Sequence, residues 1–76
     1  MHSQCILLTT SQCHLCTDAK NLLKNMNVEY TVKDIDDDEM LLLEYRLLVP
    51  VLLYRDNELK WPFNSLDVMN FIEKIE

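Results

Sequence analysis

Two cysteines separated by two residues, Cys13 and Cys16, are the part of this sequence best suited to do chemistry. They follow a Thr-Thr-Ser-Gln turn and open a segment with helical periodicity, which places Cys13 at or near the first turn of a predicted helix. The unpaired N–H groups and the dipole of a helix start favour negative charge, and the thiolate is the reactive form of cysteine. Cys16 lies on the same helix face, within reach of a disulfide with Cys13. The pattern therefore predicts thiol–disulfide chemistry at this position.

The size and charge of the chain exclude several classes of function. Its 76 residues make one small domain, residues 1–76, and 49% of them are apolar, which is enough for one compact core. The net charge of −6 leaves no basic patch for nucleic acid, and no apolar run approaches membrane-spanning length. The first residues lack the features of a signal sequence, so we expect a cytoplasmic protein. In that compartment a C-x-x-C pair is more often catalytic or metal-binding than structural.

Apolar periodicity predicts a βαβαββα order of elements in an α/β domain. The first strand is a continuous apolar run, typical of a central strand buried on both faces. The first helix carries Cys16 on its inner, apolar stripe and leaves Cys13 nearer to solvent. The first two strands should be parallel, with a right-handed crossover. The predicted strands are 5–9, 28–32, 51–54 and 59–61, and the predicted helices run from 13 or 14 to 26, from about 37 to 47, and from 64 or 65 to about 75.

The chain contains no glycine, so backbone positions with positive φ must fall on Asn, Asp or a strained residue. Asn25 or Asn27 would end the first helix, and Asp56-Asn57 would form the hairpin turn. The acidic run 34–39 lacks the glycine and the distal Glu of a calcium loop. We interpret it as one Asp that caps the second helix, with the other carboxylates at the positive end of that helix. This helix has apolar residues on more than the one face that can pack against the sheet. The additional leucines are either extra core or an exposed patch for a partner.

The order of elements, with C-x-x-C at the first helix and Val-Pro before a later strand, resembles the thioredoxin fold, and its short form resembles glutaredoxins. More narrowly, Cys13-His14-Leu15-Cys16, Asp34-Ile35-Asp36 and Val49-Pro50-Val51-Leu52 look like a family of small bacterial glutaredoxin-like proteins. The resemblance covers nearly the whole chain. It implies a thioredoxin-like, glutaredoxin-type domain with a mixed four-stranded sheet and helices on both faces.

The resemblance also implies roles for single residues. Cys13 matches the attacking cysteine of the family and Cys16 matches the resolving cysteine. Pro50 matches the cis-proline that packs beside the cysteines. Val49 would present its backbone to an extended substrate, such as the cysteinyl part of glutathione.

The chain departs from glutaredoxins at positions that usually hold glutathione. Thr10, Ser11 and Gln12 stand where a Lys or Arg usually precedes the first cysteine, and residues 61–64 replace a Gly-Gly stretch. We therefore expect no tightly bound cofactor and only millimolar affinity for glutathione. Around the thiols we expect no cation, and instead an apolar rim suited to a protein partner: Leu15, Leu48, Val49 and Trp61 or Phe63.

The leading function is that of a dithiol–disulfide oxidoreductase, which would act as a monomer on a protein disulfide substrate or reductase. Cys13, Cys16, His14, Leu15, and the Val49-Pro50 pair are its candidate site residues. His14 has two interpretations. Protonated, it would lower the pKa of Cys13 as a neighbouring charge, and otherwise it is a solvated loop residue.

Two other functions compete with this one. The first is a module that binds a metal or a [2Fe–2S] cluster. Zinc usually needs four ligands, and one C-x-x-C pair with His14, His2 and Cys5 as remote extras makes a closed site in one chain improbable, so we assign no metal ligand. A cluster shared by two chains remains an alternative. The second is a non-catalytic interaction module that uses Leu15, Leu48 and the leucines of the second helix, although such a module has no need of two thiols. Cys5 is most simply a small buried apolar residue.

Overall fold

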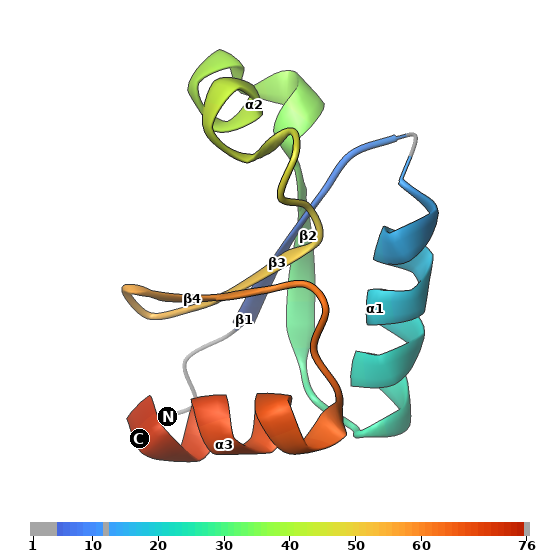
Figure 1. The fold of residues 1–76 in the computed structure, drawn as a ribbon, viewed down its shortest axis with the longest axis vertical. Coiled ribbons are helices and arrows are strands. Elements are labelled where there is room, and N and C mark those ends of the chain that lie inside the picture. The colour runs from blue at the N-terminus through green and yellow to red at the C-terminus, as the bar shows by residue number, and fades with distance from the viewer. Residues whose placement is uncertain (1–4, 12, 76) are drawn as a thin grey trace.

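The computed structural model describes residues 5–11 and 13–75, and its elements follow the predicted order with one added 3₁₀ turn. Within the described residues, no helix is long and apolar enough to cross a lipid bilayer. The elements, drawn in Figure 1, are β1 (Cys5–Thr9), α1 (His14–Asn25), β2 (Tyr30–Asp34), the 3₁₀ helix η1 (Ile35–Asp37), α2 (Glu39–Tyr45), β3 (Val51–Tyr54), β4 (Asn57–Lys60) and α3 (Ser65–Ile75).

The four strands form one mixed sheet in the order β2-β1-β3-β4. β1 pairs in parallel with β2 and antiparallel with β3, and β3 and β4 form a hairpin. The predicted β-α-β unit and the predicted mixed sheet are thus confirmed. Since side chains alternate between the two faces of a strand, the register places Leu7 beside Leu52 on one face and Leu8 beside Val51 on the other.

The sheet separates two apolar clusters, with α1 and α3 on one side and α2 on the other (Figure 1). The smaller cluster, under α2, is built on Leu8, Ile35 and Val51. Because α2 has only seven residues, this face is incompletely covered and Ile6 is 38% exposed. The prediction that β1 is buried on both faces is therefore wrong at Ile6. The larger cluster contains Cys5, Leu7, Ala19, Leu23, Leu52, Tyr54, Phe63 and Val68.

The second helix is shorter than predicted and contains no buried residue. Asp38 caps it, since one carboxylate oxygen of Asp38 accepts hydrogen bonds from the N–H groups of Met40 at 3.0 Å and Leu41 at 3.2 Å. This confirms that one Asp of the acidic run is a helix cap. Leu41 packs against the smaller cluster, whereas Met40 and Leu43 are 79% and 73% exposed. Part of the apolar surplus of this helix is therefore surface.

The end of α1 requires a residue in the left-handed conformation. The N–H group of Val28 donates to the carbonyl oxygen of Leu23 at 3.0 Å, which is the longer hydrogen bond of a Schellman motif. Asn27 takes φ 57° in this motif, so the choice between Asn25 and Asn27 is resolved in favour of Asn27. Because this motif uses Val28, β2 begins at Tyr30 and not at the predicted residue 28.

Asn27→Ala should lower the free energy of unfolding by about 1 kcal/mol, because the Cβ of alanine disfavours the left-handed conformation and asparagine tolerates it better. Asn27→Gly should leave stability unchanged or raise it. Asn25→Ala is the matched control, since Asn25 is the last residue of α1 and has no positive φ. Denaturation in guanidinium measures all three variants, and equal losses for Asn27→Ala and Asn25→Ala would contradict this account.

The hairpin turn consists of Arg55 and Asp56, one residue earlier than predicted. The register pairs Tyr54 with Asn57, and Arg55 takes φ 56°. A positive φ is unfavourable for a residue other than glycine. In this conformation the guanidinium carbon of Arg55 lies 5.5 Å from the centre of the Tyr54 ring, which is a favourable cation–π contact. β4 consequently starts two residues earlier than predicted and ends before Trp61.

The third helix follows a reciprocal capping pair. The N–H group of Asp67 donates to Asn64 Oδ1 at 2.9 Å, and the N–H group of Asn64 donates to Asp67 Oδ2 at 3.0 Å. Asn64, one of the two predicted caps, is therefore the cap. Phe63, just before it, is 5% exposed and packs edge-to-face on Trp61 with ring centres 4.9 Å apart. Phe63, one of the two aromatic residues expected at an apolar rim around the thiols, is thus a core residue and does not line the pocket at Cys13.

Candidate active site

Cys13 lies immediately before α1 and caps this helix with its sulfur. Cys13 Sγ accepts a hydrogen bond from the N–H group of Cys16 at 3.1 Å, so it pairs one of the N–H groups that a helix start leaves unsatisfied. Cys13 and Cys16 form a disulfide, and their Cα atoms are 5.3 Å apart. The structure therefore joins the two cysteines at the helix start where their spacing placed them.

The two sulfurs lie in different environments. Cys16 is 2% exposed and lies on the buried stripe of α1 with Ala19 and Leu23, which confirms the predicted phase of the helix. Cys13 is partly exposed and lines a surface pocket of about 250 Å³. Cys13 is therefore accessible from solution and Cys16 is not.

Val49 and Pro50 lie beside the cysteines, as the resemblance implied. The Val49–Pro50 peptide bond is cis, as is the Trp61–Pro62 bond, and Pro50 is fully buried. The carbonyl oxygen of Val49 lies 3.9 Å from Cys13 Sγ. The N–H group of Val49 donates to the carbonyl oxygen of Tyr45 at 3.0 Å. This N–H group is thus already paired within the chain, whereas the carbonyl oxygen of Val49 faces the thiol, and the expectation that Val49 presents its backbone to a substrate stays a prediction.

The two polar neighbours of Cys13 Sγ act in opposite directions on its ionisation. The N–H group of Cys16 favours a thiolate, whereas the carbonyl oxygen of Val49 favours a protonated thiol. The N–H contact is the shorter one, at 3.1 Å against 3.9 Å, and the dipole of α1 adds to it. The same contacts would favour a thiolate at Cys13 once the disulfide is reduced.

The pocket at Cys13 contains residues that sequence analysis named and residues that it missed. His14, Leu15 and Val49 line the pocket as predicted, together with the unpredicted Arg46 and Leu47. The expectation of no cation near the thiols is therefore wrong. Arg46 is far from the C-x-x-C motif in sequence, but the short connection from α2 to the Val-Pro pair brings it there. The short spacing between the second helix and the Val-Pro pair is the feature of the sequence that could have indicated Arg46 and Leu47 as neighbours of Cys13.

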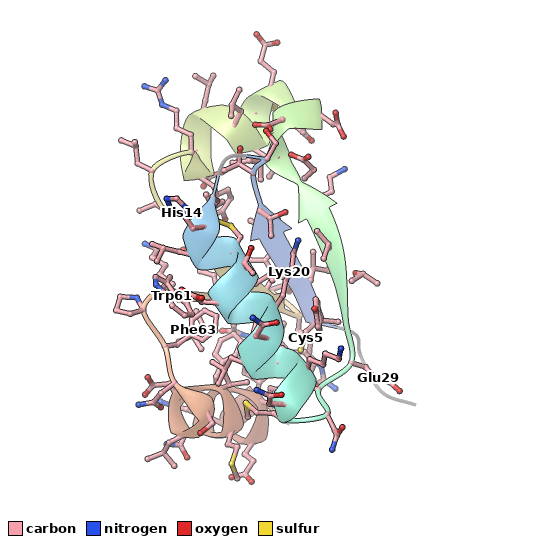
Figure 2. All side chains as sticks on the ribbon, turned by 90° about the vertical axis from the view of Figure 1, so that its right-hand side faces the viewer. Cys5, His14, Lys20, Glu29, Trp61 and Phe63 are labelled. Carbon is pink, nitrogen blue, oxygen red and sulfur yellow. A yellow bond between two sulfur atoms is a disulfide. The ribbon has the colours of Figure 1, made fainter. Side chains whose placement is uncertain are left out.

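The remaining cysteine and histidine positions do not extend this site. Figure 2 shows His14 at the first turn of α1 and Cys5 far below it along the long axis of the molecule. Cys5 is 3% exposed within the larger cluster, in agreement with its interpretation as an apolar core residue. No three His, Cys, Asp or Glu side chains among residues 5–11 and 13–75 are grouped so as to hold a metal ion. His2 lies outside the described residues.

Asp36 fastens the turn that leads to Cys13. Its Oδ1 accepts a hydrogen bond from the Thr10 hydroxyl at 2.8 Å, and its Oδ2 accepts from the Ser11 hydroxyl at 2.9 Å and the Ser11 N–H at 3.2 Å. These bonds, first of all that from Thr10, hold the pKa of Asp36 below its ordinary value of 3.8. The local sequence predicts for Asp36 only a place at the positive end of a helix. Its partners lie 25 and 26 residues away, where no local pattern reveals them.

Asp36→Asn should lower the melting temperature more than Asp37→Asn at pH 7. Both changes remove one negative charge from η1, but only Asp36 binds Thr10 and Ser11, and the amide NH₂ of asparagine cannot accept a hydrogen bond. Because the pKa of Asp36 is lowered in the folded protein, its stabilisation is complete above the ordinary value of 3.8, which applies to the unfolded chain, and is lost as the pH falls through the folded value. The gap between wild type and Asp36→Asn should therefore close in acid. Equal melting temperatures of the two variants at pH 7 would contradict the assignment.

Known proteins share this sequence pattern and this fold. Residues 4–73 match the family model described as Glutaredoxin-like domain (DUF836). The X-ray structure of the structural genomics target protein XcR50 from X. campestris is 32% identical, covers 92% of this chain and 96% of its own, and superposes with a TM-score of 0.84. The solution structure of the same target is 32% identical, with a TM-score of 0.83 and coverages of 93% and 94%. No curated protein matches the chain.

These matches agree with the order of the strands, the helices on both faces and the Cys13–Cys16 pair at the start of α1. The family model covers far more than half of the chain, and the structural match extends over nearly all of it. The protein is an α/β protein of thioredoxin-like fold that belongs to the glutaredoxin-like domain family.

Proposed function

We propose that this protein is a thiol–disulfide oxidoreductase that uses Cys13 and Cys16 to reduce or exchange the disulfide bonds of a protein substrate. The observation that carries the proposal is the environment of the pair: Cys13 is partly exposed and caps α1, and it is bonded to a buried Cys16. Membership of a glutaredoxin-like family supports a redox role.

The reaction begins with the reduced protein, in which the Cys13 thiolate attacks one sulfur of the substrate disulfide. This step forms a mixed disulfide and releases the first substrate sulfur as a thiolate, which takes up a proton. Cys16 then loses its proton and attacks Cys13 Sγ, so that the second substrate sulfur leaves and is protonated in turn. The substrate gains two electrons and the protein is oxidised to the Cys13–Cys16 disulfide. A dithiol protein or two glutathione molecules would return it to the dithiol form.

The neighbours of the pair would bind the substrate. His14, Leu15 and Val49 line the pocket around Cys13, and Pro50 lies buried behind Val49. Among the residues that the structure describes, Arg46 is the only lysine or arginine that lines this pocket, whereas glutathione carries two carboxylates. We therefore expect no tightly bound cofactor, and a millimolar dissociation constant for glutathione, which corresponds to about 4 kcal/mol. Chemical-shift titration measures this dissociation constant, and saturation at micromolar concentrations of glutathione would contradict the expectation.

The proposed activity suits a monomer in a reducing compartment such as the cytoplasm.

The reduction potential of the Cys13–Cys16 pair and its turnover test the proposal together. Redox-active pairs of this kind have potentials between about −270 and −120 mV, whereas structural disulfides of secreted proteins lie below about −300 mV. We expect a potential between about −270 and −120 mV. We also expect catalytic reduction of a model disulfide, faster with a thioredoxin-type dithiol system than with glutathione as the reductant. A potential below about −300 mV together with no turnover would refute the proposal.

A further inference from the structure

The surface beside Cys13 is continuous with an exposed apolar stripe that begins on α2. Met40, Leu43 and Leu47 follow an i, i+3, i+7 spacing, which aligns them along one side of the helix and the turn after it. These three side chains, which we call the α2 stripe, are 79%, 73% and 86% exposed. Leu47, at the end of the stripe, also lines the pocket of Cys13. The stripe therefore leads directly to the reactive sulfur.

Arg46 adds a positive charge at the junction between the stripe and the thiol. Arg46 is among the residues that line the same pocket as Cys13 and Leu47. Within the described residues the guanidinium of Arg46 forms no hydrogen bond or ion pair, and the ion pair found there joins Lys60 and Glu58. In a chain with a net charge of −6, this unpaired cation belongs to a residue that lines the pocket of Cys13, so a carboxylate of a partner would be attracted to this part of the surface.

A small ligand fits this surface less well than a protein does. The pocket of about 250 Å³ lies below the range of about 300–1,000 Å³ that is usual for small-molecule sites. Most of the α2 stripe lies outside it, and glutathione has no large apolar side chain to cover Leu47. The N–H group of Val49 is paired with Tyr45, which leaves only the carbonyl oxygen of this residue for main-chain pairing with a substrate and gives side-chain contacts a larger share in recognition.

We infer that the partner in disulfide exchange is a protein whose reactive cysteine has two distinctive neighbours. One is a large apolar side chain, which packs against Leu15 and Leu47, and the other is a carboxylate, which pairs with Arg46. The inference rests on the proposed oxidoreductase function and adds to it the chemistry of the substrate. Exposed ion pairs change equilibria by factors of about 2–5, and burial of a leucine against exposed neighbours is worth at least as much.

The test measures how fast the reduced wild-type protein reduces symmetrical disulfides of blocked five-residue peptides. Ala-Leu-Cys-Glu-Ala and Ala-Glu-Cys-Leu-Ala present both neighbours in both chain directions, and each is compared with a version that has Lys for Glu or Ala for Leu. In at least one direction we expect Glu to give rates about 3–10-fold above Lys, and Leu to give rates about 3–5-fold above Ala. About 1 M salt, with a Debye length of about 3 Å, should remove the preference for Glu and keep the preference for Leu.

Two pairs of variants locate these preferences on the surface. Arg46→Gln should abolish the preference for Glu, while Arg55→Gln, which removes the same charge in the hairpin turn, should keep it. Leu47→Gln should reduce the preference for Leu, while Leu66→Gln should keep it, since Leu66 is a 61% exposed leucine of α3 that does not line the pocket. The comparison within each pair separates recognition from general effects of charge or apolar surface.

Different experimental results would contradict this inference and the proposed function. If the wild-type protein reduces hydroxyethyl disulfide but treats all peptides alike, the surface is not recognised and the inference is wrong, while the oxidoreductase function stands. Glutathione disulfide reduced faster than every peptide, with the advantage lost in Arg46→Gln, would assign Arg46 to glutathione and also overturn it. A dimer in sedimentation that Leu47→Gln dissociates and Leu66→Gln does not would assign the stripe to a second copy. If no disulfide is reduced at all, the proposed function itself fails.

Discussion

Cys16→Ser should trap a mixed disulfide on Cys13, whereas Cys13→Ser should abolish adduct formation altogether. Attack on a substrate needs only the accessible Cys13 thiolate, but release of the product needs the second sulfur, which is held next to the first at the start of α1. We therefore expect nearly stoichiometric adduct with a peptide disulfide in Cys16→Ser, and a rate at least about 1,000-fold lower in Cys13→Ser, because a serine hydroxyl does not ionise at neutral pH. Intact-protein mass spectrometry distinguishes the two outcomes.

Cys5→Ala is the matched control for this experiment. Cys5 is buried in the core, and we expect Cys5→Ala to turn over the substrate like the wild type and to accumulate no adduct. Equal loss of adduct formation in Cys13→Ser and Cys16→Ser would contradict the division into attacking and resolving thiols. It would instead favour a structural or metal-binding role for the pair.

Alkylation of the reduced protein at pH 7 should modify Cys13 at least about 30-fold faster than Cys16 or Cys5. In the reduced protein Cys13 Sγ accepts a hydrogen bond from the N–H group of Cys16 at a helix start, which favours the reactive thiolate over the thiol. Cys16 and Cys5 are only 2% and 3% exposed, so a reagent reaches them only when the structure opens. Digestion and mass spectrometry after timed exposure to iodoacetamide give the three rates.

The unfolded protein provides the control for this measurement. In concentrated guanidinium the three cysteines should react at similar rates, because both the helix start and the core are lost. A faster reaction of Cys16 or Cys5 in the folded protein would show that accessibility and the field of α1 do not decide reactivity, and the assignment of the attacking thiol would then be wrong.

The local sequence was sufficient to predict the two elements that hold Cys13 and Cys16 in place. The continuous apolar run of β1 and the helical spacing of α1 set the bounds of both elements and the phase that buries Cys16, because these features depend on contacts between near neighbours. The absence of glycine restricted the left-handed residue after α1 to two asparagines. The choice of Asn27 over Asn25 depended on where Val28 packs against the core, which is a tertiary contact.

The limits of β2 and β4 were predicted less well, because the partners of these strands decide them. β2 continues to Asp34, where a carboxylate caps η1 through the N–H group of Asp36 at 2.9 Å. β4 begins at Asn57 because the register with β3 leaves a turn of two residues and puts Arg55, which no turn propensity favours, at positive φ. The apolar pattern does not contain this register information.

The sequence alone determined the reactive pair of this protein: a C-x-x-C pair at a helix start, with a Val-Pro segment later in the chain. Only the tertiary structure decided what surrounds the pair. Arg46 and Leu47 reach the pocket of Cys13 because α2 ends beside it, and Asp36 holds the preceding turn from 25 residues away. The ionisation and geometry of a thiol at a helix start come from its own few residues, so the sequence shows them directly. Charge and apolar surface offered to a partner come from segments that meet only when the sheet forms, so no local pattern reports them.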